Sequence, residues 1–145
     1  MRYLGDGQPL SRENAWRQMA MFIGHWSLRG FGMWAVEERE TGAFAGRVGL
    51  HYPEGWPGRE VGWTLAREHW GKGYAFEAAA ASLDHAFRTL EWPRAISVID
   101  PDNHRSIRVA ERLGERRDRE VELGGRRVLL YSIERDDWLA ARARA

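Results

Sequence analysis

Residues 67–78, with the sequence REHWGKGYAFEA, combine residue types that could bind an anion. Gly71, Lys72 and Gly73 stand where a strand-like pattern gives way to an alanine-rich helical pattern. The first N–H groups of a helix lack intrahelical partners, and the helix dipole favours negative charge beside them. Glycines let a phosphate come close to the main chain, and Lys72 adds a cation at the rim. The stretch predicts either a phosphate site or a helix that starts after a glycine turn and binds nothing.

Two common nucleotide-binding loops do not fit this spacing. A Walker A loop is Gly-x4-Gly-Lys-Ser/Thr, but position 66 is Ala66 and Lys72 is followed by Gly73. A dinucleotide fingerprint needs a third glycine at position 76, which is Phe76. The sequence therefore indicates a phosphate loop without the spacing of either nucleotide-binding family.

A second polar cluster lies in residues 101–114, PDNHRSIRVAERLG, which read as a well-delimited helix. Asp102 or Asn103 can cap its start, and Gly114 can end it. Ser106 then falls in the first turn, where a hydroxyl is common for capping alone.

Helices and strands that would hold these clusters follow from periodicity and turn residues. Helices are expected at 12–28, 73–90 and 101–114, with a short one capped near Asp136. The first is capped by Ser11, is ended by Gly30 and carries an apolar stripe of Trp16, Met19, Ala20, Ile23 and Trp26. The stripe of the second is Phe76, Ala79, Ala80, Leu83, Phe87 and Leu90.

Strands are expected at 31–39, 43–52, 59–66 and 94–100, followed by a hairpin within 119–138 whose turn is Gly124-Gly125. The order is helix, three strands, helix, strand, helix, two strands. This order predicts one mixed α/β or α+β domain over 1–145 with a single main sheet.

Composition narrows the function classes. The formal net charge of +1 gives no overall case for nucleic acid or a membrane surface as a partner. The absence of cysteine excludes disulfides, thiolate catalysis and a cysteine zinc site, and the five histidines are too scattered for a local metal motif. No apolar run reaches about 18 residues, and the first ten residues lack a signal-peptide core, so a cytoplasmic protein is expected.

Taken together, WGKGYAFEA and NHRSIRVAERLG resemble the GCN5-related N-acetyltransferase (GNAT) superfamily, and within it the RimJ/RimL-type, ribosomal-protein-alanine N-acetyltransferase-like branch. The resemblance runs from about residue 30 to 138. It implies the GNAT fold, a mixed and mostly antiparallel central sheet flanked by helices. The chain starts late relative to that pattern, so the usual first strand is expected to be missing.

The resemblance also implies acetyl-CoA as co-substrate and no metal. In that superfamily the loop after the fourth strand grips the pyrophosphate, the strand pairs with the pantetheine arm, and the asparagine hydrogen-bonds the pantetheine. The serine would sit near the thioester sulfur. The coenzyme-binding residues implied are Trp63, Thr64, Leu65, Ala66, His69, Trp70, Gly71, Lys72, Gly73, Tyr74, Ala75, Asn103 and Ser106.

Three positions depart from the family pattern. Glu68 stands where a glutamine or arginine is usual, so the loop amides must do most of the binding. Ala110 replaces the tyrosine that serves many members as general acid, which leaves Ser106 as the candidate acid. Gly114 is followed by Glu115 in place of phenylalanine.

A neutral amine must attack the thioester, so a base is needed near the strand at 59–66. Glu60 is the preferred candidate, ahead of Glu54 and His51; the competing interpretation is a half-exposed Glu60 paired with an arginine. Trp34, Trp56 and Trp63 could form an aromatic acceptor wall, and Tyr131 is expected in the core.

The sequence thus predicts an N-acetyltransferase that moves acetyl from acetyl-CoA to a primary amine, on a protein N-terminus or a small molecule, in a ternary complex. A non-catalytic acyl-CoA-binding domain of the same fold and a domain without ligand remain as alternatives. A homodimer is possible, because an uncovered sheet edge invites pairing.

Overall fold

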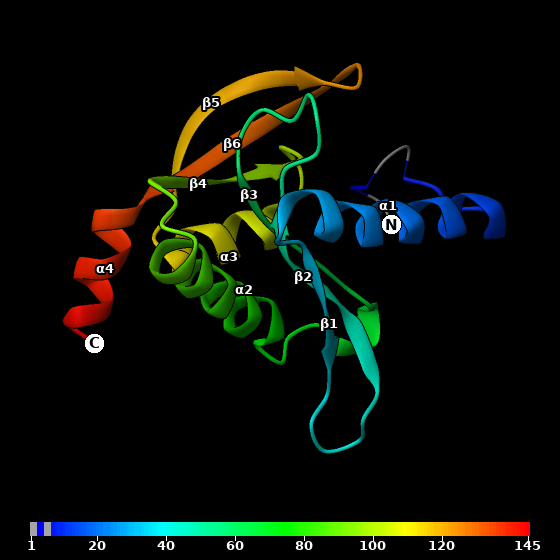
Figure 1. The fold of residues 1–145 in the computed structure, drawn as a ribbon, viewed down its shortest axis with the longest axis horizontal. Coiled ribbons are helices and arrows are strands. Elements are labelled where there is room, and N and C mark those ends of the chain that lie inside the picture. The colour runs from blue at the N-terminus through cyan, green and yellow to red at the C-terminus, as the bar shows by residue number, and fades with distance from the viewer. Residues whose placement is uncertain (1–2, 5–6) are drawn as a thin grey trace.

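The computed structural model describes residues 3–4 and 7–145 and holds one six-stranded sheet (Figure 1). The strands are β1 Met33–Glu37, β2 Phe44–His51, β3 Glu60–Leu65, β4 Arg94–Ile99, β5 Arg116–Leu123 and β6 Arg126–Glu134. Their order across the sheet is β1-β2-β3-β4-β6-β5, and β3 with β4 is the parallel pair among antiparallel neighbours. The predicted mixed, mostly antiparallel sheet is confirmed.

The helices follow the predicted order. They are α1 Arg12–Arg29, α2 Tyr74–Asp84, α3 His104–Leu113 and α4 Arg135–Ala143, with a 3-10 turn η1 Arg67–His69 and a π-helical turn η2 His85–Thr89 that continues α2. Ser11 caps α1 by accepting from the Asn14 N–H, and Gly30 ends it with φ 76°. The Gly124-Gly125 turn has φ 58° and 76°, as a two-residue hairpin turn requires.

The main core lies between α2 and the middle of the sheet. Val48, Leu50 and Val61 point from β2 and β3 and are fully buried. Most of the predicted apolar stripe of α2 packs against these side chains. Ala79, Leu83 and Phe87 are fully buried, and Phe76 and Leu90, at the two ends of the stripe, are partly buried. Since side chains alternate along a strand, Arg47, His51 and Glu60 point to the opposite face of the sheet.

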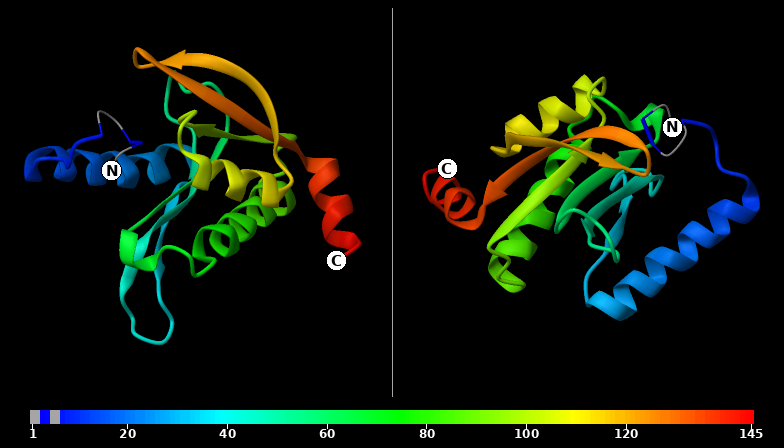
Figure 2. Two further views of the ribbon diagram at one scale, coloured as in Figure 1. Left: turned by 180° about the vertical axis from the view of Figure 1, so that it is seen from behind. Right: turned by 90° about the horizontal axis from the view of Figure 1, so that it is seen from above.

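Helix α1 differs from its prediction. Trp16, Met19 and Ile23 of the expected core stripe are 68%, 60% and 70% exposed. The helix lies apart from α2 and α3 and extends beyond the strands, so the sheet covers little of its surface (Figure 2). Its buried residue is His25, which accepts from the Tyr52 N–H at Nε2 (2.8 Å) and therefore donates from Nδ1 to the Phe31 carbonyl (2.9 Å).

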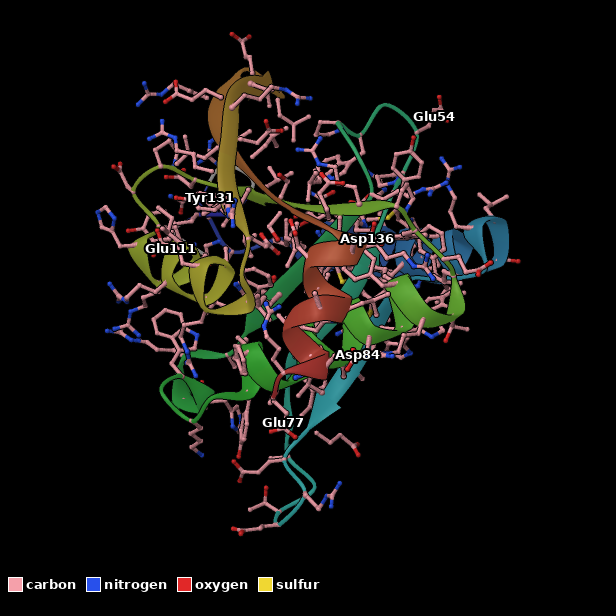
Figure 3. All side chains as sticks on the ribbon, turned by 90° about the vertical axis from the view of Figure 1, so that its left-hand side faces the viewer. Glu54, Glu77, Asp84, Glu111, Tyr131 and Asp136 are labelled. Carbon is pink, nitrogen blue, oxygen red and sulfur yellow. The ribbon has the colours of Figure 1, made fainter. Side chains whose placement is uncertain are left out.

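Helix α4 lies across α2 beside Asp84 (Figure 3). The Asp84 carboxylate accepts from Trp138 Nε1 (2.9 Å) and from Arg142 (2.8 Å). The helix begins at Arg135 and has no side-chain cap, so the expected cap near Asp136 is wrong: Asp136 lies inside the first turn.

Strands β3 and β4 separate soon after they meet, and we call this opening the fork, formed by residues 61–65 of β3 and 97–99 of β4. One residue pair, Glu60 with Ile96, is in parallel register. The Ala66 N–H bonds the Ala45 carbonyl of the β2 side (2.8 Å). Because backbone groups alternate along a strand, Trp63 and Leu65 direct their N–H groups into the fork.

Candidate active site

The glycine loop, residues 66–73, ends at a helix start that carries unpaired N–H groups. Gly73 is the N-cap of α2, has φ 82° and gives no side-chain cap. Its carbonyl accepts from the Glu77 N–H (3.0 Å), which leaves the N–H groups of Tyr74, Ala75 and Phe76 without an intrahelical partner. Such a helix start favours a bound anion through these amides and the helix dipole.

The two loop glycines are required by their backbone. Gly71 and Gly73 have φ 76° and 82°, a conformation that costs other residues about 1–2 kcal/mol. A Cβ built on either would meet no protein atom within 4 Å. The space in front of both glycines is therefore open to a ligand and is not needed by the protein.

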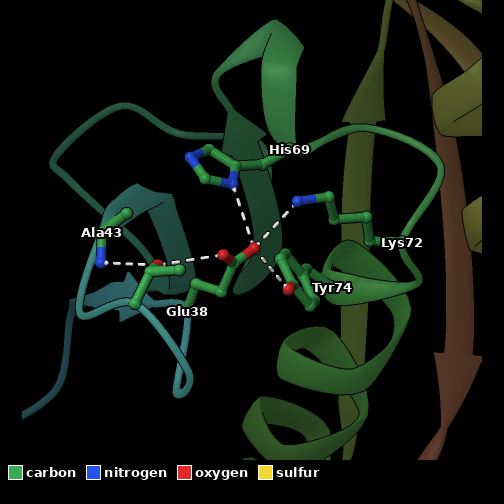
Figure 4. A network of polar contacts seen from close by, with 6 residues as sticks. Glu38, Ala43, His69, Lys72 and Tyr74 are labelled. Carbon is green, nitrogen blue, oxygen red and sulfur yellow. Dashed lines mark hydrogen bonds and ion pairs between the residues drawn. The ribbon is translucent and has the colours of Figure 1, made fainter.

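Lys72 does not stand free at the rim of this loop (Figure 4). Its Nζ donates to Glu38 Oε2 (2.9 Å), and the Tyr74 hydroxyl donates to the same oxygen (2.7 Å). The buried His69 ring lies 3.6 Å from it. The bonds from Lys72 and Tyr74, and a third from Thr41, hold the pKa of Glu38 at about 2.

Sequence reasoning missed Glu38, because its partners in the glycine loop, Lys72 and Tyr74, lie more than thirty positions away and a charged residue beside a turn carries no signal of its own. It ties the β1–β2 hairpin to the glycine loop. The Lys72 charge is largely taken up by this contact, so an anion at the loop would be held mainly by main-chain N–H groups.

The backbone of β3 narrows the set of residues available to a ligand in the fork. Both backbone groups of Ala66 are used, the N–H by Ala45 and the C=O by the His69 N–H (3.0 Å). The Leu65 carbonyl accepts from Trp70 Nε1 (2.9 Å). By the alternation of backbone groups, the Trp63 N–H and C=O and the Leu65 N–H remain directed toward the fork, whereas Thr64, paired with Arg47, faces β2.

A cleft of about 690 Å³ opens at the fork. The preferred base Glu60 lines it, together with four of the coenzyme candidates: Trp63, Thr64, Asn103 and Ser106. The other coenzyme candidates, 65–66 and 69–75, lie outside its lining, in and beside the glycine loop. Asn103 caps α3 by accepting from the Ser106 N–H (3.2 Å), and Ser106 Oγ accepts from Trp63 Nε1 (3.2 Å). The Ser106 hydroxyl hydrogen is left available to another acceptor.

Glu60 is buried, with 8% of its surface exposed. Its carboxylate accepts from Trp56 Nε1 (2.7 Å) and from the Val98 N–H (3.2 Å), which are neutral donors. Burial raises the pKa of Glu60 to about 7. The interpretation of Glu60 as a half-exposed residue paired with an arginine is wrong. A carboxylate with a pKa near neutrality has the basicity that proton transfer at neutral pH requires.

A second buried carboxyl, Glu115, lies behind β4. Ser97 Oγ is 2.8 Å from the Val61 carbonyl and 3.0 Å from Glu115 Oε1. The Ser97 hydroxyl has one hydrogen, so it donates to one of these two oxygens at a time. Burial, with the Glu60 charge nearby, raises the pKa of Glu115 to about 8, which favours its protonated form at neutral pH. Sequence reasoning noted Glu115 only as a departure from the family pattern.

The other candidates for the base and for the acceptor wall lie in different surroundings. His51 lines the cleft, and its burial, together with His25 and Arg47, lowers its pKa to about 4. Glu54 lies at the tip of the β2–β3 loop with a fully exposed side chain, 3.6 Å from Arg29 (Figure 3). Trp56 and Trp63 line the cleft, but Trp34 packs against Trp26 and His85 and does not join an acceptor wall.

Tyr131 is buried in a small second core, as predicted, and Ala110 is fully buried in the same core. In the described part of the chain, no three His, Asp or Glu side chains gather closely enough to hold a metal ion. None of the helices formed by residues 7–145 is both long and apolar enough to cross a membrane.

Comparisons with known proteins agree with the fold. The family described as "Acetyltransferase (GNAT) domain" matches residues 1–116. The chain is 34% identical to an acetyltransferase from Agrobacterium tumefaciens str. C58 of known structure, with a TM-score of 0.80 over 90% of this chain and 76% of that one.

Two curated relatives come from bacilli. The uncharacterised protein YkkB of Bacillus subtilis (strain 168) is 36% identical over 70% of this chain, and the uncharacterised N-acetyltransferase p20 of Bacillus licheniformis is 33% identical over 67%. The alignments span 60% and 56% of those relatives' own lengths. Because the family match covers most of the chain, the protein belongs to the GNAT acetyltransferase family.

Proposed function

We propose that this chain is an acetyl-CoA-dependent N-acetyltransferase that passes the acetyl group directly to a primary amine in a ternary complex. One observation carries the proposal: a buried carboxylate, a free hydroxyl and an open strand edge share one cleft, next to a helix start with unpaired amides. The RimJ/RimL branch, the cytoplasmic location and a homodimer stay predictions from the sequence.

Each part has a role in this proposal. The N–H groups of residues 71–75 hold the pyrophosphate, and the fork edge of Trp63 and Leu65 pairs with the pantetheine arm. The Trp63 N–H, which points into the fork, is a suitable donor to the oxyanion that forms on the thioester carbonyl.

The chemical step then needs two proton positions. The amine nitrogen attacks the thioester carbon, Glu60 takes the proton that the amine loses, and the carbon–sulfur bond breaks as the amide forms. The departing sulfur accepts a hydrogen bond from the Ser106 hydroxyl and leaves as the coenzyme A thiolate, which takes up a proton from water while Glu60 releases its proton to water. Holding both substrates in the cleft removes much of the entropic part of the barrier.

The test combines binding with turnover. Acetyl-CoA should raise the melting temperature with increasing concentration, and an amine should release coenzyme A thiol. Ser106→Ala should lower the rate of thiol release by about 10²-fold without weakening acetyl-CoA binding. Tight acetyl-CoA binding without thiol release for any amine would support the non-catalytic alternative, and a flat melting temperature would remove both.

A further inference from the structure

Some of the charged side chains that line the cleft have an ion-pair partner, and others do not. Asp100 is paired with Arg126 at 2.7 Å, and Glu54 lies toward solvent near Arg29. Glu60 accepts hydrogen bonds from neutral N–H donors, and the charges of Glu60 and Arg47 attract each other without forming an ion pair. Arg47 lines the same cleft, and it forms no hydrogen bond or ion pair within residues 3–4 and 7–145.

Arg47 is nevertheless held in place. It lies on β2 opposite Thr64, on the face of the sheet that also carries His51 and Glu60. Its guanidinium stacks on the Phe22 ring of α1, with 4.5 Å from Cζ to the ring centroid. Burial lowers the pKa of Arg47, yet an arginine stays charged at any physiological pH. A stacked guanidinium with unused donors is ready to bind a carboxylate through two parallel hydrogen bonds.

We propose that the acceptor is a small amino carboxylate, such as a free amino acid, whose amine meets Glu60 while its carboxylate binds the Arg47 guanidinium. This inference rests on the proposed function and names the substrate class of that site. A polyamine would bring further positive charge toward Arg47, and an ordinary protein N-terminus carries no carboxylate beside its amine. A zwitterion can place its amine at Glu60 and its carboxylate at Arg47, which form no ion pair within the described residues, and a buried charge without a close partner is costly.

The experiment compares an amino acid with its own carboxamide, at a pH well above the pKa of Glu60. The wild-type enzyme should favour the acid by about tenfold or more in kcat/KM. Arg47→Gln should raise KM for the acid by about 10- to 100-fold and change kcat/KM for the carboxamide by much less. Arg112→Gln is a matched control, because Arg112 also stacks on a phenylalanine at 4.5 Å, on Phe76 outside the cleft. Arg112→Gln should leave KM and kcat/KM unchanged for both substrates.

Two results would overturn the inference while leaving the proposed function intact. The first is a wild-type enzyme with a higher kcat/KM for the carboxamide than for the acid. The second is an Arg47→Gln variant whose kcat/KM falls equally for both substrates while its melting temperature is unchanged. If no amine is acetylated at all, the proposed function fails instead. Calorimetric titration of the amino acid into the coenzyme A complex then tests whether Arg47 binds the carboxylate. If it does, the affinity for the amino acid should fall in Arg47→Gln and stay unchanged in Arg112→Gln.

Discussion

The glycine loop and the cleft are made from different parts of the chain. The loop presents main-chain N–H groups from one continuous stretch, and its glycines matter through their φ angles. The cleft presents side chains from α1, β2, β3, β4 and α3, each placed by its own element. A main-chain site tolerates changes of side chain, whereas a side-chain site depends on each residue. We therefore expect loop variants to change coenzyme affinity and cleft variants to change turnover.

The largest expected effect is in the cleft. Glu60→Gln keeps the size of the side chain and removes the base, so kcat should fall by about 10²- to 10⁴-fold. Steady-state kinetics measure this, and calorimetry should find an unchanged affinity for coenzyme A. Glu111→Gln, an exposed carboxylate on α3 (Figure 3), is the control and should behave as wild type. An equal loss of coenzyme affinity in Glu60→Gln would break the division between the two regions.

The next effect tests the loop. Gly73→Ala places a side chain at φ 82° and in the open space beside the α2 amides, so the dissociation constant for coenzyme A should rise about tenfold. Its kcat at saturating acetyl-CoA should change little. Gly30→Ala at the end of α1 has φ 76° and equally open space, and Gly30 is not among the residues that line the cleft, so the variant carries the same backbone cost away from the ligand. Equal affinities in the two variants would contradict a coenzyme site at the loop.

A third prediction concerns pH and the fork. The pKa of Glu115 rises from 4.5 to about 8 on folding, so its contribution to stability is complete below pH 4.5 and is lost as the pH rises through 8. Glu115→Gln keeps an oxygen that can accept from the Ser97 hydroxyl, and it cannot ionise. Its melting temperature should match wild type near pH 5 and exceed it by a few degrees near pH 9. Glu122→Gln, which changes an exposed residue of β5, should have the melting temperature of the wild type at both pH values. The same result for Glu115→Gln would show that Glu115 is already ionised in the folded protein at pH 5.

The smallest expected effect is electrostatic. Glu38→Gln keeps an oxygen for Tyr74 and Lys72 and removes a negative charge beside the glycine loop, so coenzyme A affinity should rise about two- to fivefold at low salt. The gain should fade as salt is added. Glu122→Gln removes a charge from the exposed face of β5 and serves as the control, because Glu122 is not among the groups that act on Lys72 and Tyr74. A lower affinity at every salt concentration would mean that Glu38 is needed to order the loop.

Features with a local cause could be predicted from the sequence. The order of elements, the Ser11, Asn103 and Gly114 caps and the hairpin turn depend on neighbouring residues, and all of them agree with the structure. The α2 stripe also agrees, because a helix that crosses a sheet buries one continuous face.

Features that depend on distant contacts could not be predicted. The α1 stripe fails because periodicity says which residues share a face, not whether another element covers it. Contacts with residues on other elements determine the positions of Glu38, Arg47 and Glu115. Neither the burial of a side chain nor its unused hydrogen-bonding capacity can be read from one sequence. Glu60 was named, but its burial and the donors Trp56 and Val98 came only with the fold.

The most direct test of the account follows both products of one reaction. Wild-type protein is incubated with acetyl-CoA and an amine, and coenzyme A release is measured together with the mass of the acceptor. We predict equal amounts of free thiol and acetylated amine from the wild type, and loss of both in Glu60→Gln with acetyl-CoA still bound. Thiol release without an acetylated amine, or equal turnover in Glu60→Gln, would contradict acetyl transfer in this cleft.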